Sequence, residues 1–411
     1  MYRRILIANR ADCAVRLIRA CHEEGIEAYV ITSRDEQARL AHALADGVIC
    51  TGASMDAYLA EDDILEAARL HGCEAILPGW GFLSEDALFA RRCRLAHIDF
   101  IGPGEGHLWA FGDKLETVRL LSDTRQHGVM TAEEALADLG SVPMPCMLKG
   151  RFGGGGKQVT RMTERESLGV RLSALRDMSR LRDYYVEPYI DGRHIEYQVM
   201  GDGCGHVHVL GARDCTWQNG HQKYMELSYE DADQAALRAA RDGVCVRLSE
   251  LGYRGYGTVE FIVDRDGGAH LLELNPRLQV EHGVTEMTSG IDIVRTAIRL
   301  AWSGRYEPVA VPANVEEAIE FRLFARGTGR IGRIGFDGYD WPGYPQPEDA
   351  LGRVETGYAC GAEISGVYDG MIARFILGAP LGKARACMQK WLSGFVVEGG
   401  RHNLNDLYDQ P

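Results

Sequence analysis

Five polar side chains alternate with apolar ones in the segment ELNPRLQVE, which covers residues 273–281. The polar positions are Glu273, Asn275, Arg277, Gln279 and Glu281. Because alternate side chains of an extended chain share a face, this segment would carry two carboxylates, a guanidinium and two amides in one row. Such a row combines groups that can bind a cation, bind an anion and accept a proton.

A second carboxylate is predicted to face Glu273 from a neighbouring strand. The segment GTVEFIVDRDGGAHLLEL contains the turn signal Asp266-Gly267 between two β-type runs, which favours a hairpin with a two-residue loop. The cross-strand pairs would then be Arg265 with Gly268, Asp264 with Ala269, and Glu260 with Glu273. Like charges in direct opposition destabilise a hairpin, so the two glutamates call for a cation or a shared proton between them. Oxygen ligands suit Mg²⁺ or Mn²⁺, and Asn275 could complete the site; an exposed hairpin with a different turn is the alternative.

The segment KGRFGGGGKQ could bind phosphate. An apolar run ends at Lys149 and leads into four glycines and a second lysine. Glycines let backbone N–H groups approach phosphate oxygens, and the lysines add positive charge. The pattern is not a P-loop, because G-x-x-x-x-G-K-[ST] is absent. A flexible surface loop is the alternative.

The segment RDCTWQNGHQKYME gathers further polar side chains. His221 and Lys223 are two positions apart and share a face in extended structure, which fits an anion contact; a solvated strand edge is the alternative. Cys215 could be a nucleophile, although a structural cysteine is the more common outcome for a residue of this kind.

The elements that must position these residues begin with a βαβ pattern in the first hundred residues. Strands are predicted at Arg4–Ala8, Ala28–Thr32, Gly47–Thr51, Ala75–Pro78 and Asp99–Gly102, with helices at Ala14–Glu24, Asp62–His71 and Glu85–Arg94. The loop Pro78–Asp86 follows a strand, at the edge where parallel sheets bind ligands. The segments RDYYVEPYIDGRHIEYQV and HVHVLGARDCTWQ resemble antiparallel strands, residues 130–190 have a lid-like character, and a β-rich piece follows from Glu316.

Bulk properties narrow the class of protein. A length of 411 residues predicts two or three domains, and the net charge of -14 argues against non-specific nucleic-acid binding. Eleven cysteines without a C-x-x-C pair fit reduced thiols in a cytoplasmic enzyme. No stretch approaches the ~20 apolar residues of a membrane span, and the N-terminal apolar run is too short for a signal peptide.

Taken together, these motifs resemble biotin carboxylase, a member of the ATP-grasp ligases. The segments that carry the resemblance are ILIANR, PGWGFLSE, FIGP, GDK, the lysine before GGGGK, RDC followed by HQK, and the final ELNPRLQVEHGVTE, in family order along nearly the whole chain. The resemblance implies a fold of the α/β class, with an α+β arrangement when the whole chain is considered. The chain would form three domains. These are a doubly wound parallel-sheet domain (1–112), an ATP-grasp domain (113–315) with a mobile lid at about 130–190, and a β-rich C-terminal domain (316–411) that is shorter than usual.

The resemblance also implies residue roles. Glu281 would be the base that deprotonates bicarbonate, Arg353 would stabilise the biotin enolate, and Lys223 and Arg277 would surround bicarbonate. Glu260, Glu273 and Asn275 would bind Mg²⁺ or Mn²⁺. The side chains that would contact ATP or bicarbonate are Lys114, Lys149, Gly155, Gly156, Glu187, Pro188, Tyr189, Ile190, His194, Gln218, His221, Glu260, Gln279 and Val280.

The implied reaction is the ATP-dependent carboxylation of biotin by bicarbonate through carboxyphosphate, as part of an acyl-CoA-type carboxylase. The chain has no MKM biotinylation site, so biotin would arrive on a separate carrier protein, with a carboxyltransferase subunit as a further partner and a homodimer left open. Two alternatives remain: a biotin-independent ATP-grasp ligase acting on another small nucleophile, and a non-catalytic nucleotide-binding homologue.

Several positions depart from the family pattern. Two arginines before HQK are replaced by Asn219-Gly220, and a proline after VEH is replaced by Gly283. The other departures are Pro188 for a lysine, Gln158 for a glycine, Ala11-Asp12 for Gly-Glu, and a shortened segment at 124–145. These changes bear on the partner and on oligomer contacts more than on the ATP chemistry.

Overall fold

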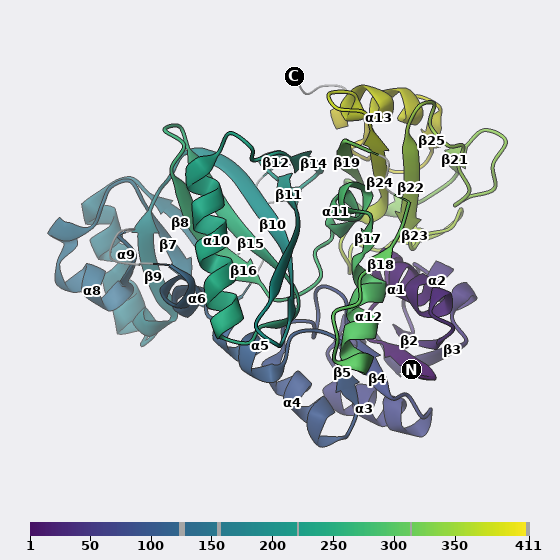
Figure 1. Ribbon diagram of the computed structural model, residues 1–411, viewed down its shortest axis with the longest axis horizontal. Helices are drawn as coiled ribbons and strands as arrows, with labels where there is room; N and C mark the ends of the chain where they lie inside the picture. The colour runs from purple at the N-terminus through teal and green to yellow at the C-terminus, as the bar shows by residue number, and fades with distance from the viewer. Residues whose placement is uncertain (123–127, 154–157, 220–221, 313–314, 408–411) are drawn as a thin grey trace.

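A computed structural model describes residues 1–122, 128–153, 158–219, 222–312 and 315–407 of the chain (Figure 1). Residues 1–112 contain a five-stranded parallel sheet in the order β3-β2-β1-β4-β5. Its strands are β1 Arg4–Ile7, β2 Glu27–Ser33, β3 Gly47–Gly52, β4 Ala75–Leu77 and β5 Asp99–Phe100. All five predicted strands are therefore confirmed to within a few residues.

Helices cover both faces of this parallel sheet, because successive residues of its strands point into different cores. Ile5 and Ile7 of β1 pack in one hydrophobic cluster with α1, whereas Leu6 packs in another with α3 and α4. In chain order, the helical segments of residues 1–112 are α1 Ala11–Glu23, α2 Leu40–Leu44, the 3₁₀ turn η1 Met55–Tyr58, α3 Glu61–Leu70, α4 Ala87–Leu95 and α5 Glu105–Phe111, and α6 Lys114–Leu121 follows them. The sheet is thus doubly wound, as predicted.

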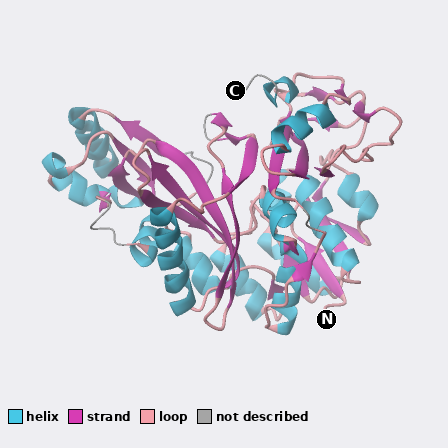
Figure 2. Cartoon of the chain, turned by 45° about the horizontal axis from the view of Figure 1, so that its top comes forward, coloured by secondary structure: helices cyan, strands magenta, loops and turns pink. Residues whose placement is uncertain are grey.

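An eight-stranded antiparallel sheet forms the centre of the molecule, in the order β16-β15-β10-β11-β14-β19-β24-β22 (Figure 2). Its strands are β10 Gly192–Asp202, β11 Val207–Asp214, β14 Met225–Tyr229, β15 Arg254–Asp264, β16 Ala269–Asn275, β19 Glu317–Phe324, β22 Leu351–Thr356 and β24 Met371–Ala379. The β-rich C-terminal segment that the sequence predicted therefore contributes β19, β22 and β24 to the same sheet. Helix α10 Ala235–Glu250 packs against one part of it, and α11 His282–Ser289 packs against β11, β19 and β24.

A smaller four-stranded sheet, in the order β6-β9-β7-β8, lies to the left of the central sheet in Figure 1. Its elements are β6 Met130–Thr131, α8 Ala132–Ala137, η2 Leu139–Ser141, β7 Cys146–Gly150, β8 Val159–Met162, α9 Arg165–Asp177, η3 Leu181–Asp183 and β9 Tyr184–Pro188. This lobe has a hydrophobic core of its own, which includes Val142, Leu148 and Leu172. Strand β9 belongs here, so the predicted antiparallel run at residues 182–199 divides between two sheets.

Short elements complete the fold. They are β12 Gln218–Asn219 with β13 Gln222–Lys223, β17 Ile291–Asp292 with β18 Val309–Ala310, β20 Gly329–Arg330 with β23 Glu363–Ile364, β21 Ile334–Phe336 with β25 Phe395–Val397, and the helical segments α12 Ile293–Ser303, α13 Ala384–Leu392 and η4 Leu404–Leu407. None of the helices in the described part of the chain combines the length and apolar character that a membrane crossing requires.

The β15–β16 hairpin places Glu260 opposite Glu273, as predicted, but by a different route. The backbone N–H of Asp264 donates to the carbonyl of Gly268, so the loop has three residues and the predicted turn pairs are wrong. Gly267 takes a φ of 83°, the left-handed conformation that a three-residue loop needs and that glycine adopts at low cost. A β-bulge beyond Phe261 then shifts the register by one residue and restores the glutamate pair.

The extended row predicted for residues 273–281 is correct only in part. Strand β16 ends at Asn275, because Pro276 has no N–H to continue the ladder. Residues 276–281 form an irregular segment that leads into α11, with Glu281 at the N-cap position.

Candidate active site

One cavity of about 780 Å³ lies between the small lobe, the central sheet and the loop after β4. The predicted loop Pro78–Asp86 contributes Trp80, Gly81 and Glu85 to its wall. Sixteen of the predicted site residues line it, and these are Lys114, Lys149, Glu187, Pro188, Tyr189, Ile190, His194, Gln218, Lys223, Glu260, Glu273, Asn275, Arg277, Gln279, Val280 and Glu281. The structure therefore brings residues from six separate stretches of sequence to one space.

One end of the cavity is largely apolar. Met147 and Val159 come from the small lobe, whereas Ile262 and Leu272 come from the central sheet. The bulge in β16 lets the consecutive residues Leu271 and Leu272 both reach the cavity. Such walls, with a few polar groups at one edge, suit a flat aromatic ligand such as a nucleotide base.

Two lysines lie next to this apolar end, and each forms an ion pair with a carboxylate. Lys149 Nζ lies 2.5 Å from Glu187 Oε1, and Lys114 contacts Glu273 Oε2. Burial lowers the pKa of Lys114, but Glu273 and Glu260 outweigh this effect and raise it, so the ammonium stays charged. Both lysines can therefore offer positive charge to an anion that enters the cavity.

Three side chains that can supply oxygen donors, Glu260, Glu273 and Asn275, lie together beside Lys114. The Asn275 side-chain amide donates to Glu260 Oε1 at 2.8 Å and to Glu273 Oε1 at 3.2 Å. Although burial would raise the pKa of Glu260, Lys223 and His194 outweigh burial and hold that pKa far below its ordinary value. Two ionised carboxylates form a hard donor set that fits Mg²⁺ or Mn²⁺, and Asn275 Oδ1, which here accepts from Arg277, would join them when the amide turns.

Glu281 is a buried carboxylate of the cavity that two cations hold. It is 1 % exposed, and its oxygens lie 2.7 Å from Lys223 Nζ and 2.8 Å from Arg322 Nη2. Burial would raise the pKa of Glu281, yet Lys223, Arg322 and Arg213 together hold it well below its usual range. The side chain is therefore ionised and able to accept a proton from a bound acid.

Arg277 lies between this carboxylate and the cation site. Its guanidinium donates to Glu85 Oε2 at 3.0 Å, to Gln279 Oε1 at 2.7 Å and to Asn275 Oδ1 at 3.1 Å. An arginine held by three acceptors in this way presents a fixed positive charge to a small anion. The predicted row thus keeps its chemical order although its second half is not a strand.

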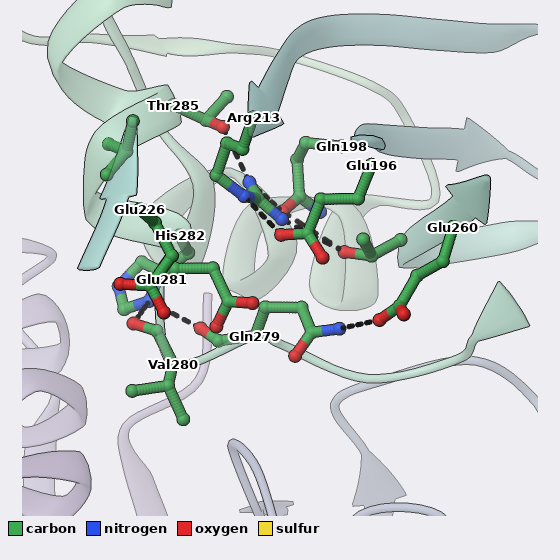
Figure 3. A network of polar contacts seen from close by, with 12 residues as sticks. Glu196, Gln198, Arg213, Glu226, Glu260, Gln279, Val280, Glu281, His282 and Thr285 are labelled. Atoms are coloured by element: carbon green, nitrogen blue, oxygen red, sulfur yellow. Dashed lines mark hydrogen bonds and ion pairs between the residues drawn. The ribbon is translucent and has the colours of Figure 1, made fainter. Parts of the chain in front are cut away.

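Sequence reasoning assigned no role to three buried residues that hold the site together: Glu196 and Arg213, which Figure 3 shows, and Arg322. Arg213 donates to Glu196 Oε1 at 2.6 Å and to Thr285 Oγ1 at 2.6 Å, and Lys223 Nζ lies 2.7 Å from Glu196 Oε2. Arg322 binds Glu281 from the other side. A signal existed for Glu196, because it follows His194 by two positions on β10 and shares its face. Arg322 comes from a distant strand, and no local pattern points to it.

His194 and Gln218, both predicted to contact ATP or bicarbonate, bind each other, and His194 also binds Glu260. His194 Nε2 lies 2.7 Å from Glu260 Oε2, and the Gln218 amide nitrogen lies 2.9 Å from His194 Nδ1. Burial lowers the pKa of His194, but Glu260 outweighs burial and raises it. The imidazole therefore orients Glu260 within the oxygen cluster.

Arg353 is not among the residues that line the cavity. Its Nη1 lies 2.8 Å from Glu286 Oε2, and its Nε lies 3.2 Å from Glu355 Oε1, both of which are buried carboxylates. The predicted residues Gly155, Gly156 and His221 lie outside the described residues.

The fold and the cavity together define an ATP-dependent ligase of the ATP-grasp class. Residues 1–108 match the family described as "Biotin carboxylase, N-terminal domain", and residues 115–307 match "Carbamoyl-phosphate synthase L chain, ATP binding domain". Biotin carboxylase 1 of Bacillus subtilis is 35% identical to 97% of this chain, which covers 92% of that protein. The chain belongs to the biotin carboxylase family.

Solved structures agree with this assignment. The biotin carboxylase domain dimer of Hydrogenobacter thermophilus 2-oxoglutarate carboxylase, in complex with MgADP, ADP and bicarbonate, is 33% identical with a TM-score of 0.85, over 99% of this chain and 93% of that one. A Campylobacter jejuni biotin carboxylase complex has a TM-score of 0.86 at 30% identity, over 100% and 95%. The chain spans 57% of the propionyl-CoA carboxylase alpha chain of Sus scrofa, to which it is 34% identical.

Proposed function

We propose that this protein carboxylates biotin on a separate carrier protein, using ATP and bicarbonate. The observation that carries the proposal is the Lys223–Glu281 pair, which opens onto the same cavity as Lys114, Lys149 and the three oxygen donors. One space therefore holds a base, an anion site and groups that neutralise phosphate. The domain boundaries at residues 112 and 315 remain part of the proposal.

Glu260, Glu273 and Asn275 would hold Mg²⁺ or Mn²⁺, which would neutralise charge on the transferring phosphoryl group. Lys114 contacts one oxygen of Glu273, and a bound cation would compete with the ammonium for that carboxylate. The released Lys114 would then be free for the phosphates of ATP, together with Lys149.

The chemical step begins with bicarbonate against Arg277, Gln279 and Val280. Glu281 accepts the bicarbonate proton, and the resulting oxyanion attacks the γ-phosphorus of ATP to give carboxyphosphate and ADP. The low pKa of Glu281 in the empty site rises when an anion binds beside it, because like charge favours the protonated carboxyl. Carboxyphosphate then breaks into CO₂ and phosphate beside biotin, the phosphate takes the N1′ proton, and the deprotonated N1′ adds to CO₂ to give carboxybiotin.

The partners belong to the same proposal. The relatives with matching chains are subunits or domains of pyruvate, propionyl-CoA and 2-oxoglutarate carboxylases. A biotin carboxyl carrier protein and a carboxyltransferase subunit are therefore the expected partners, and a homodimer is the expected assembly. All eleven cysteines are free thiols, which supports a cytoplasmic location.

The decisive experiment measures ATP hydrolysis with and without bicarbonate, and with free biotin or a biotinylated carrier from the same organism. We expect bicarbonate-dependent turnover that the carrier stimulates more than free biotin does, because a tethered substrate reaches millimolar effective concentration. ATP hydrolysis that neither bicarbonate nor the carrier changes would contradict the proposal.

The position of Arg353 favours one alternative, a biotin-independent ligase that acts on another small nucleophile. The guanidinium pairs with Glu286 and Glu355 and does not line the cavity where a biotin enolate would form. The variant Arg353→Ala distinguishes biotin carboxylation from a biotin-independent ligase reaction. A large loss of carrier-dependent turnover supports biotin as the substrate, whereas unchanged turnover with no response to the carrier supports the alternative.

A further inference from the structure

Two buried carboxylates face each other directly behind Glu281. Glu226 of β14 pairs in register with Glu320 of β19, and both side chains are 0 % exposed. Side chains at opposed positions of antiparallel strands have their Cβ atoms roughly 4.5–5.5 Å apart, and like charges there repel. Figure 3 shows Glu226 beside Glu281.

The cations around this pair do not suffice for every carboxylate. Arg322 contacts Glu226 and also lies 2.8 Å from Glu281 Oε2 and 3.4 Å from Glu320 Oε1. Arg374 reaches Glu320 Oε2 at only 3.4 Å, because its closer contacts are with Asp12 and Glu355. One guanidinium is therefore shared among three acids.

Hydrogen-bond donors are also too few for these carboxylates. Both oxygens of Glu226 and Oε1 of Glu320 are buried without a hydrogen-bond partner among the residues that the structure describes. An ionised carboxylate in that state has only the shared ion pairs with Arg322 and Arg374 to offset its lost hydration, and no hydrogen bond at these oxygens. A proton on either acid removes one negative charge and supplies one O–H donor.

The pKa shifts of Glu226 and Glu320 agree with a shortage of cations and hydrogen-bond donors around the pair. Burial is the main cause that raises the pKa of Glu226 to about 8, against Arg322, and that of Glu320 to about 7, against Arg374 and Arg322. The charged and titratable groups that face the pair from the packed elements are Lys223, Arg322, Arg374, Glu281, Glu355, Asp12 and the thiol of Cys215.

We propose that Glu226 and Glu320 hold one proton between them at neutral pH and thereby position Arg322 for Glu281. With the proton in place, Arg322 pairs mainly with Glu281 and fixes the orientation of that carboxylate. Without it, three anions compete for Arg322 and the Glu281 contact loosens. The role toward Glu281 rests on the proposed function, whereas the shared proton is a property of the fold and can be tested alone.

The first test compares the stability of the wild type and Glu226→Gln as a function of pH. An acid with a raised pKa binds more protons in the folded than in the unfolded chain, so its contribution to stability is lost as pH rises from about 4.5 to about 8. Urea unfolding should show that the folding constant of the wild type falls on the order of 10- to 100-fold between about pH 6 and pH 8.5 through this group. Glu226→Gln carries no titratable proton and should lose this part of the decline.

Glu317→Gln is the matched control. Glu317 lies on β19 three positions before Glu320, on the opposite face, and accepts a hydrogen bond from the backbone of Ala384. It should keep the wild-type pH dependence. Glu320→Gln offers a second route if Glu226→Gln fails to fold. Because one proton serves both acids, either variant should remove the slope and the double variant should add little to it.

The second test measures the pH dependence of turnover, which would not change if Glu226 had only a structural role. The ratio of bicarbonate-dependent ATP turnover at pH 9 to that at pH 7 should rise several-fold in Glu226→Gln, because no second negative charge can form beside Arg322. Infrared difference spectra should also show a protonated carboxyl band at pH 7 that is absent from the variant. The shared proton is overturned if the wild type and Glu226→Gln lose stability in parallel and no such band appears. If the stability and infrared measurements come out as expected but neither the wild type nor any variant shows bicarbonate-dependent turnover, the shared proton is supported. The proposed function is then contradicted.

Discussion

Two sets of ion pairs lie side by side in this protein and differ in their access to solvent. The pairs that line the cavity keep part of their surface open, and the Lys114–Glu273 side chains are 20% and 22% exposed. Beneath them, Arg374 is fully buried with Asp12 and Glu355, and Arg16 is buried with Glu286 and Asp292. The buried set joins α1, α11 and the C-terminal strands of the central sheet.

The difference in access implies a difference in role. A ligand can replace one member of a cavity pair; in the proposed function a metal ion would take Glu273 and a phosphate would take Lys114. A buried pair has no such substitute, and the removal of one member leaves the other charged and unsolvated. The cavity pairs should therefore control activity, whereas the buried layer should control stability and the placement of α11, which begins directly after Glu281.

The largest effect is expected for Glu281→Gln. The variant keeps the shape of the side chain but cannot accept a proton, so kcat for bicarbonate-dependent ATP hydrolysis should fall roughly 10²- to 10⁴-fold. Nucleotide affinity, measured by calorimetry, should change much less, because the base acts in the transition state. Glu317→Gln again serves as the control, and near-normal turnover in Glu281→Gln would contradict the assignment of the base.

The next effect is on stability and comes from the buried layer. Arg374→Met removes the cation shared by Asp12, Glu320 and Glu355, and the loss of one partner from a buried ion pair typically costs about 3–5 kcal/mol. Urea unfolding at neutral pH should show this decrease in the free energy of unfolding. Arg176→Met is the control, because Arg176 is exposed on α9 and its ion-pair partner is the adjacent Asp177. If Arg374→Met and Arg176→Met have equal free energies of unfolding, the buried ion pairs do not control stability as proposed.

The sequence predicted the parallel sheet and most of the cavity because those features have local causes. Strand and helix periodicity identified all five strands of the first sheet, and the alternation after Glu273 identified the polar row. The Glu260–Glu273 pair was predicted from a two-residue turn, yet the structure reaches it through a three-residue loop and a bulge. Two local errors cancelled, since each shifts the register by one residue.

The rest depends on contacts between distant segments, which no local pattern contains. Arg322 lies 41 residues from Glu281, and Asp12 lies 362 residues from Arg374. Arg353 is the opposite case, in which a local motif predicted a role that distant contacts do not support. Its motif predicted a role in the cavity, but the orientation of its side chain is set by Glu286 on α11 and by the space beside Gly283.

Gly283 marks the boundary between the two sets, and its substitution should have the smallest effect. A Cβ at this position would lie 2.5 Å from Arg353 Nη2 and 2.5 Å from Ile376 Cδ1, closer than side chains tolerate. In Gly283→Ala one neighbour must therefore move, and overpacking of this kind costs about 1–3 kcal/mol. The end of an arginine side chain yields more easily than a packed isoleucine, so we expect Arg353 to leave Glu286.

A double-mutant cycle identifies which neighbour moves. If Arg353 yields, Gly283→Ala should cost less in an Arg353→Ala background than in the wild type, whereas Ile376→Val, which deletes the Cδ1 atom, should not change the cost. The freed guanidinium would then be available to the cavity, and KM for free biotin should fall in Gly283→Ala. Relief by Ile376→Val alone, with KM unchanged, would show that Arg353 belongs to the buried layer and does not exchange between the two sets.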